Sequence, residues 1–183
     1  MAGGGTPAAI HFLGAESDCC RGLRFYLWMT ERQHRRLPVW DYRQPGLYFV
    51  TIVAAKRLPR FGRVDQVEVR LTAAGRVVEE EWSSLSLAYP SVRLDAFVLM
   101  PDHLHGILDF QRSDPAGLSE AVRRFKARST RRVNLAAGSQ GRPLWQRSFY
   151  ERIIRGEGEL ARLRDYIAGN PARWAMCRAR TPL

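Results

Sequence analysis

The sequence lacks the features that mark membrane and secreted proteins. No apolar run approaches the roughly 20 residues that span a bilayer, and the first residues lack the basic and apolar regions of a secretory signal. The three cysteines, Cys19, Cys20 and Cys177, show no spacing typical of a zinc site or a disulfide framework. We therefore expect a cytoplasmic protein in a reducing environment, with no membrane partner.

Lysine is scarce, and arginine supplies almost all of the positive charge. Lys56 and Lys126 are the two lysines, yet 29 basic residues against 18 acidic ones give a net charge of +11. Such a surplus favours a polyanionic partner, with nucleic acid as the first choice and an anionic membrane as the second. The alternative interpretation is a generally basic proteome, in which the charge carries no function.

The length of 183 residues fits one domain with a hydrophobic core. Residues 1–36 have no hydrophobic periodicity, and we expect a flexible tail there. An alternative is that translation naturally begins at Met29, so that residues 1–28 are upstream sequence. The folded domain is predicted over residues 37–176, and a short tail over residues 177–183.

Hydrophobic periodicity predicts alternating strands and helices. Residues 67–72 form a short edge strand or a hairpin arm, and Thr72 is the N-cap of a helix that ends before Pro90. The main strands are expected at residues 47–54, 92–100, 103–110 and 145–154, and two further helices at 118–133 and 157–169. This order predicts an α+β, ferredoxin-like split βαβ fold. Its antiparallel sheet has four or five strands with helices on one face, and a C-terminal helix is added.

Two histidines are separated by one apolar residue in the segment His103-Leu104-His105. In a strand, residues two apart project from the same face, roughly 7 Å apart at Cα. Two imidazoles so placed can bind one divalent metal ion, while Leu104 packs on the opposite face. Position 107 is isoleucine, which argues against a histidine-triad hydrolase. The sequence also lacks the second His-x-Ser/Thr motif of a two-histidine phosphoesterase.

A tyrosine near the C-terminus lies beside the apolar stripe of the last predicted helix. Arg162, Tyr166 and Asn170 are four residues apart and share one helix face, if the helix extends through Asn170. The phenol and the amide then point to the same place. The alternative is a tyrosine packed against the sheet, with Asn170 ending the helix before Pro171.

The helix at residues 118–133 carries a dense group of cations beside its apolar stripe. We expect these side chains to follow a phosphate backbone, because no acid compensates them. The alternative is a solvated charged face. The predicted DNA-binding side chains of this helix are Arg123, Arg124, Lys126, Arg128, Arg131 and Arg132.

These separate motifs together resemble one family. Residues 101–106 resemble the His-hydrophobic-His motif of the HUH nucleases, in the form carried by REP-associated tyrosine transposases. Residues 37–42, 143–155 and 163–174 resemble further segments of that family, in the same order along the chain. The resemblance implies a ferredoxin-like fold, a divalent metal on His103 and His105, and Tyr166 as the nucleophile. Related insertion-sequence transposases carry glutamine where this chain has the shorter Asn170, the predicted third ligand.

The resemblance also implies a reaction and its partners. We expect a transposase that uses Mg²⁺ or Mn²⁺ to cleave and rejoin single-stranded or hairpin DNA through a 5′-phosphotyrosine, as a monomer or homodimer. A free phenol has a pKa near 10, so Arg162 or Arg173 is expected to favour the phenolate and to contact DNA. The alternatives are a rolling-circle replication initiator or relaxase, and a catalytically silent protein that recognises DNA hairpins.

Overall fold

The structure is a computed structural model, which describes residues 40–179. The expected N-terminal tail and the alternative start at Met29 lie outside these residues. Residues 180–183 of the expected C-terminal tail also lie outside them.

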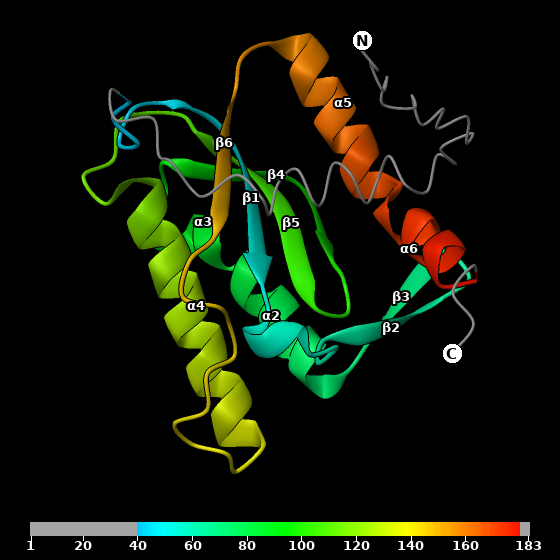
Figure 1. Ribbon diagram of the computed structural model, residues 1–183. Helices are drawn as coiled ribbons and strands as arrows, with labels where there is room; N and C mark the ends of the chain where they lie inside the picture. Colours follow the sequence, from blue (N-terminus) through cyan, green and yellow to red (C-terminus); the bar gives the residue numbers. More distant parts are fainter. Residues whose placement is uncertain (1–39, 180–183) are drawn as a thin grey trace, which may run out of the picture.

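Four antiparallel strands form the central sheet (Figure 1). Their order is β4-β5-β1-β6, which is the strand order of a ferredoxin-like fold and confirms the predicted fold class. The central strand β1 is apolar on both faces, because its side chains alternate between two buried layers. The strands are β1 (Gly46–Val53), β4 (Val92–Leu99), β5 (His103–Phe110) and β6 (Tyr150–Ile154).

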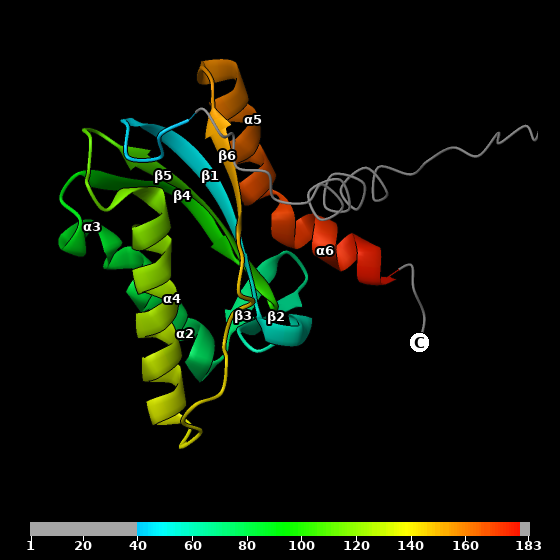
Figure 2. The same cartoon turned by 60° about the vertical axis from the view of Figure 1, so that its left-hand side comes forward.

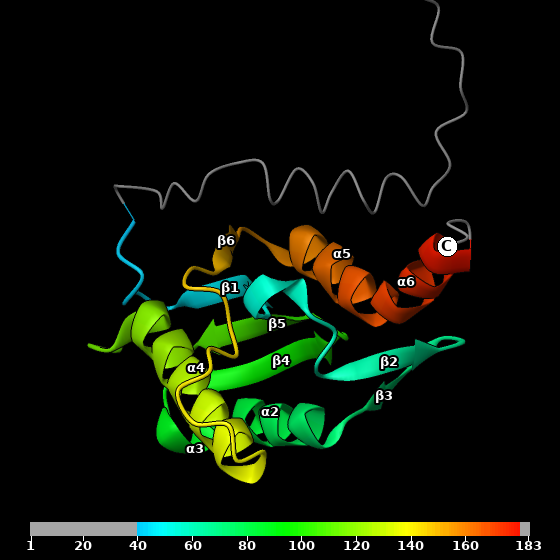
Figure 3. The same ribbon diagram turned by 60° about the horizontal axis from the view of Figure 1, so that its bottom comes forward.

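Helices cover both faces of this sheet (Figure 3). One face is covered by α2 (Ala73–Ser83), α3 (Leu85–Ala88) and α4 (Gly117–Ala136). The other face is covered by α5 (Glu157–Ala168), which α6 (Asn170–Ala179) follows. Figure 2 shows α4 and the C-terminal pair on opposite sides of the strands. The predicted C-terminal helix is therefore the element that closes the second face.

Two hydrophobic cores result from this arrangement. The larger core lies between the sheet and α2–α4 and contains Trp82, Leu104 and Phe125. The smaller core lies between the sheet and α5, and it consists of Phe49, Ile107, Ile154, Leu160, Leu163 and Ile167. The apolar stripe predicted for the last helix is thus the face of α5 that packs on the sheet.

A separate two-stranded sheet extends from the end of β1. It is formed by β2 (Gly62–Asp65) and β3 (Glu68–Leu71). The short 3-10 helix η1 (Ala55–Arg57) precedes them in the chain. The predicted strand at residues 67–72 is one arm of this hairpin, and β2 was not predicted. Thr72 caps α2 as predicted, because its hydroxyl accepts a hydrogen bond from the backbone N–H of Gly75 at 3.0 Å.

Two local predictions are corrected by the structure. The strand predicted at residues 145–154 begins at Tyr150, and Trp145 makes an isolated bridge with Ala54. The last helix does not extend through Asn170: α5 ends at Ala168, and Asn170 begins α6. Pro171 is compatible with this new helix because proline is tolerated in a first turn, where its missing N–H would have no intrahelical partner.

Cys177 in α6 is disulfide-bonded, a bond that the spacing of the cysteines did not predict. Within residues 40–179, no helix is both long enough and apolar enough to cross a bilayer.

Candidate active site

The two histidines of β5 lie side by side on the face of the sheet that α5 covers. Both are buried, and their ring centroids are 4.6 Å apart. His105 stacks on Phe49 of the smaller core, while Leu104 points into the larger core. The alternation predicted for the His-Leu-His segment is therefore present.

Gly106 follows this segment because the larger core leaves no room for a side chain. A Cβ atom at position 106 would lie 2.3 Å from Cζ2 of Trp82, well inside van der Waals contact. The indole of Trp82 thus packs directly against the backbone of β5. It supports the strand from the side opposite the two imidazoles.

Each imidazole is oriented by a neighbour that the sequence analysis did not identify. Asp102 Oδ1 lies 2.6 Å from Nδ1 of His103, and Thr51 Oγ1 lies 2.8 Å from Nδ1 of His105. A carboxylate accepts, so Nδ1 of His103 carries a proton in this contact. Carboxylates in this position orient metal-binding histidines in many proteins. The only sequence signal for Asp102 is its place beside His103.

The protonation state of His105 suits a residue that binds a metal ion. Burial, and then the adjacent His103, hold the pKa of His105 well below its usual value. His105 is therefore a neutral imidazole near pH 7, which is the form that binds a metal ion.

Tyr166 reaches the histidine pair from α5. Its phenolic oxygen lies 3.4 Å from Nε2 of His105, and its ring meets Phe49 edge to face. Arg173 of α6 donates from Nη1 to the backbone carbonyl of Tyr166 at 2.9 Å. The guanidinium carbon lies 5.2 Å from the centroid of the Tyr166 ring. Of the two arginines predicted near the phenol, Arg173 makes this contact, and Arg162 is exposed on α5.

Asn170, the predicted third ligand, is buried where α6 begins, one turn after Tyr166. In the described part of the chain, no group of three or more His, Cys, Asp or Glu residues is arranged to hold a metal ion. A metal ion on the histidine pair would therefore need ligands of another kind, such as an amide oxygen, water or a phosphate oxygen.

An ion pair fastens α5 to the edge of the sheet. Arg164 donates to both carboxylate oxygens of Asp95, at 2.8 and 2.6 Å. The register of β4 shifts between Leu94 and Phe97, which places Asp95 at the irregularity. The hydrogen bond from Arg164 is the main reason that the pKa of Asp95 is lowered. Since Arg164 precedes Tyr166 by two residues, this pair helps to fix the tyrosine.

The expectation that the cations of α4 lack compensating acids is wrong. Arg128 and Arg132 both bind the buried carboxylate of Glu81, at 2.8 and 3.0 Å, and Arg132 also binds Glu80. These acids lie on α2, far away in sequence, so the charge pattern of one helix could not reveal them. Arg123 pairs with Glu120 within α4 itself.

The remaining cations of α4 differ from one another. Lys126 donates to the backbone carbonyls of Gln146 and Arg147, at 2.6 and 2.9 Å, and so holds a loop. The guanidinium carbon of Arg124 lies 5.7 Å from the ring centroid of Tyr89. Arg131 is exposed. Four of the six cations thus have a carboxylate or carbonyl partner within the fold, and the DNA contact of α4 stays a prediction.

Comparisons with known proteins agree with this geometry. Residues 84–170 match the family model described as "Transposase IS200 like". An uncharacterized protein of Haemophilus influenzae is 32% identical over 163 residues, which cover 78% of this chain and 89% of that protein. A second Haemophilus influenzae protein, named as a REP-associated tyrosine transposase, is 28% identical over 140 residues, or 73% of this chain and 74% of its own.

A solved structure shares the fold. It is that of a REP-associated tyrosine transposase bound to a REP hairpin, with a TM-score of 0.56 and 24% sequence identity. The match covers 78% of this chain and 73% of that one. From these matches, together with the site on β5 and α5, we conclude that this chain belongs to the IS200-like transposase family.

Proposed function

We propose that this protein is a metal-dependent transposase that cleaves and rejoins single-stranded or hairpin DNA in the cytoplasm, with Tyr166 as the nucleophile. The observation that carries the proposal is the approach of the Tyr166 phenol to Nε2 of His105, at 3.4 Å. The net charge of +11 supports a DNA substrate. The hairpin bound to the solved relative supports a hairpin in particular.

The position of the phenol supports the following reaction. Tyr166 loses its proton, and its oxygen attacks the scissile phosphorus. The bond from phosphorus to the 3′ oxygen breaks, which leaves a 5′-phosphotyrosine and a free 3′-hydroxyl. A 3′-hydroxyl of the same or another strand then attacks the phosphotyrosine and releases Tyr166. The number of phosphodiester bonds is conserved, so no ATP is needed.

Two groups of this chain would assist the phenol. The guanidinium of Arg173 lies over the ring of Tyr166 and favours the phenolate by its positive charge. The ring of Tyr166 is also held by Phe49, which restricts the direction of attack.

The donor set fits a divalent metal ion. Asp102 and Thr51 engage the Nδ1 atoms of the two imidazoles, so Nε2 of His103 and His105 would bind Mg²⁺ or Mn²⁺, together with the amide of Asn170. Such an ion, when bound, polarises the scissile phosphate and neutralises charge in the transition state.

A covalent-adduct assay tests the proposal. The wild-type protein is incubated with a labelled DNA hairpin that carries single-stranded flanks, in Mg²⁺ or Mn²⁺, and is then denatured. We expect label that migrates with the protein and a second product that carries a free 3′-hydroxyl. Tight binding without adduct or nicking, at every flank sequence tried, would indicate a silent hairpin-binding protein instead.

A further inference from the structure

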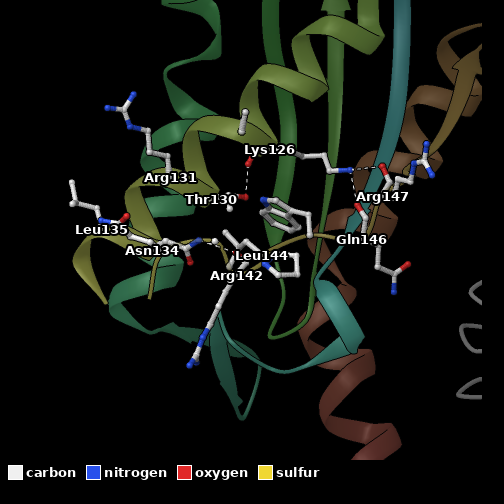
Figure 4. Close-up of a pocket in the computed structure, with 14 residues that line it drawn as sticks. Lys126, Thr130, Arg131, Asn134, Leu135, Arg142, Leu144, Gln146 and Arg147 are labelled. Carbon is white, nitrogen blue, oxygen red and sulfur yellow. Dashed lines mark hydrogen bonds between the residues drawn. The ribbon is translucent and has the colours of Figure 1, made fainter. Parts of the chain in front are cut away.

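A pocket of about 780 Å³ opens between the C-terminal half of α4 and the segment of residues 140–147 (Figure 4). Trp145, which lines it, packs on Phe125 and Phe61 of the larger core. The pocket therefore lies on the α4 side of the sheet, whereas the histidine pair and Tyr166 lie on the α5 side.

Hydrogen bonds at both ends hold this pocket in shape. Lys126 fixes one end by donating to the carbonyls of Gln146 and Arg147. The Asn134 amide fixes the other end by donating to the carbonyl of Arg142 at 2.8 Å. Figure 4 shows both contacts as they bridge from the helix to the segment. The pocket is thus formed before any ligand enters, which lowers the entropic cost of binding.

The pocket combines an apolar floor with a cationic rim. Leu144 and Trp145 are buried in the floor, and Arg131, Arg142 and Arg147 are exposed at the rim. No carboxylate lines the pocket. Among the ion pairs found within residues 40–179, none involves these three arginines, in contrast to Arg123, Arg128 and Arg132. In Figure 4 their guanidinium groups extend outward on different sides.

We propose that this pocket binds an unpaired nucleotide of single-stranded DNA, separate from the point of cleavage. The base enters the apolar hollow, and the phosphates on its two sides contact the arginines at the rim. A small anion would need the cations to converge on one point, whereas they are spread around the opening. The proposal rests on the proposed function, because it assigns part of the same DNA substrate to a second site.

The wall of the pocket is joined to the strand end that carries the active site. Gln146 donates from its backbone N–H to the carbonyl of Val53 at 2.8 Å, and Ala55 donates to the carbonyl of Leu144 at 2.9 Å. Between them, Ala54 donates to the carbonyl of Asp102, the neighbour of His103, at 2.8 Å. A nucleotide in the pocket is therefore anchored to the backbone that supports the histidine pair.

Binding of a single-stranded oligothymidylate, measured in EDTA at several salt concentrations, tests the proposal without any cleavage. The triple variant Arg131→Ala, Arg142→Ala, Arg147→Ala should bind more weakly. Its log–log salt slope should be flatter by about 1.4 units, since each of the two phosphates beside the base contributes roughly 0.7 on a single strand. The matched control Arg63→Ala, Arg76→Ala, Arg112→Ala loses the same charge outside the pocket and should keep the wild-type slope. An equal loss of affinity and of salt slope in both variants would overturn the proposal.

A crosslinking experiment locates the contact directly. An oligothymidylate that contains 4-thiothymidine should crosslink to peptides within residues 126–147, and crosslinks confined to other segments would overturn the proposal. Both measurements are independent of catalysis. If the wild type forms no covalent adduct in Mn²⁺ but the pocket variant still loses affinity, the proposed function fails and the pocket stands. If the adduct forms and the pocket variant binds normally, the pocket proposal fails and the proposed function stands.

Discussion

The phenolic oxygen of Tyr166 lies 3.4 Å from Nε2 of His105, although 61 positions separate the two residues in the chain. The contact exists because Leu160, Leu163 and Ile167 of α5 pack against Phe49 and Ile107 of the sheet. The same core therefore stabilises the helix and delivers the tyrosine to the histidine pair.

Tyr166→Phe should abolish covalent adduct formation and leave DNA binding unchanged. Phenylalanine keeps the ring contacts with Phe49 and Arg173, and only the attacking oxygen is lost. Denaturing gels with labelled DNA measure the adduct, and anisotropy measures binding. An adduct that persists in the variant would show that another residue is the nucleophile, and Tyr150 of β6 would be examined next.

His103→Ala and His105→Ala should each abolish cleavage at any accessible concentration of Mg²⁺ or Mn²⁺. Wild-type activity should disappear in EDTA and return when either ion is added. Asn170→Ala should be milder, because water can replace one neutral ligand. Circular dichroism controls for folding, since both histidines are buried. Full cleavage by the wild type in EDTA would remove the metal ion from the mechanism.

Asp102→Asn should weaken the response to Mn²⁺ without removing the nucleophile. The carboxylate accepts from Nδ1 of His103, and the amide holds the imidazole less firmly. Loss of such a partner typically lowers metal affinity by about 10–100-fold. The Mn²⁺ concentration for half-maximal cleavage should rise by about this factor, and saturating Mn²⁺ should restore most of the rate. An unchanged Mn²⁺ requirement would mean that Asp102 is a turn residue alone.

Glu81→Gln should destabilise the fold in a pH-dependent way. Burial raises the pKa of Glu81, but hydrogen bonds from Arg128 and Arg132 outweigh it, and the net pKa lies below the ordinary value of 4.5. A carboxyl with a lowered pKa stabilises the protein above its unfolded pKa, and this contribution is lost as pH falls through the folded pKa.

The Glu81→Gln variant should lose about 1–3 kcal/mol of the free energy of unfolding at pH 7, since the arginine partners are half exposed. The difference from wild type should shrink below pH 4.5. Urea unfolding at several pH values measures it. Arg128→Ala should also lower the stability, whereas Arg131→Ala, its exposed neighbour on α4, should not. A constant difference between pH 7 and pH 3 would contradict the ionic role of Glu81.

The sequence determined the order of the elements, since each has a strong local signal. The apolar stretch at residues 47–54 and the stripe of α4 each predicted an element that is present. The helix predicted at residues 157–169 ends within one residue of α5, but the second helix α6, which begins at Asn170, was not predicted. The hairpin arm β2 was missed because it is short and packs outside the main sheet.

In the candidate site, too, some features could be predicted from the sequence and others could not. Alternation along one strand was enough to place His103 and His105 on one face, and helical spacing set Tyr166 beside the stripe of α5. Tertiary packing alone decided two partners that act across the fold, Thr51 on His105 and Glu81 on the arginines of α4. It also decided that Arg173, of the two predicted arginines, contacts Tyr166. Periodicity reports which face of an element a residue occupies, whereas a contact between distant segments depends on how the faces of two elements are packed together.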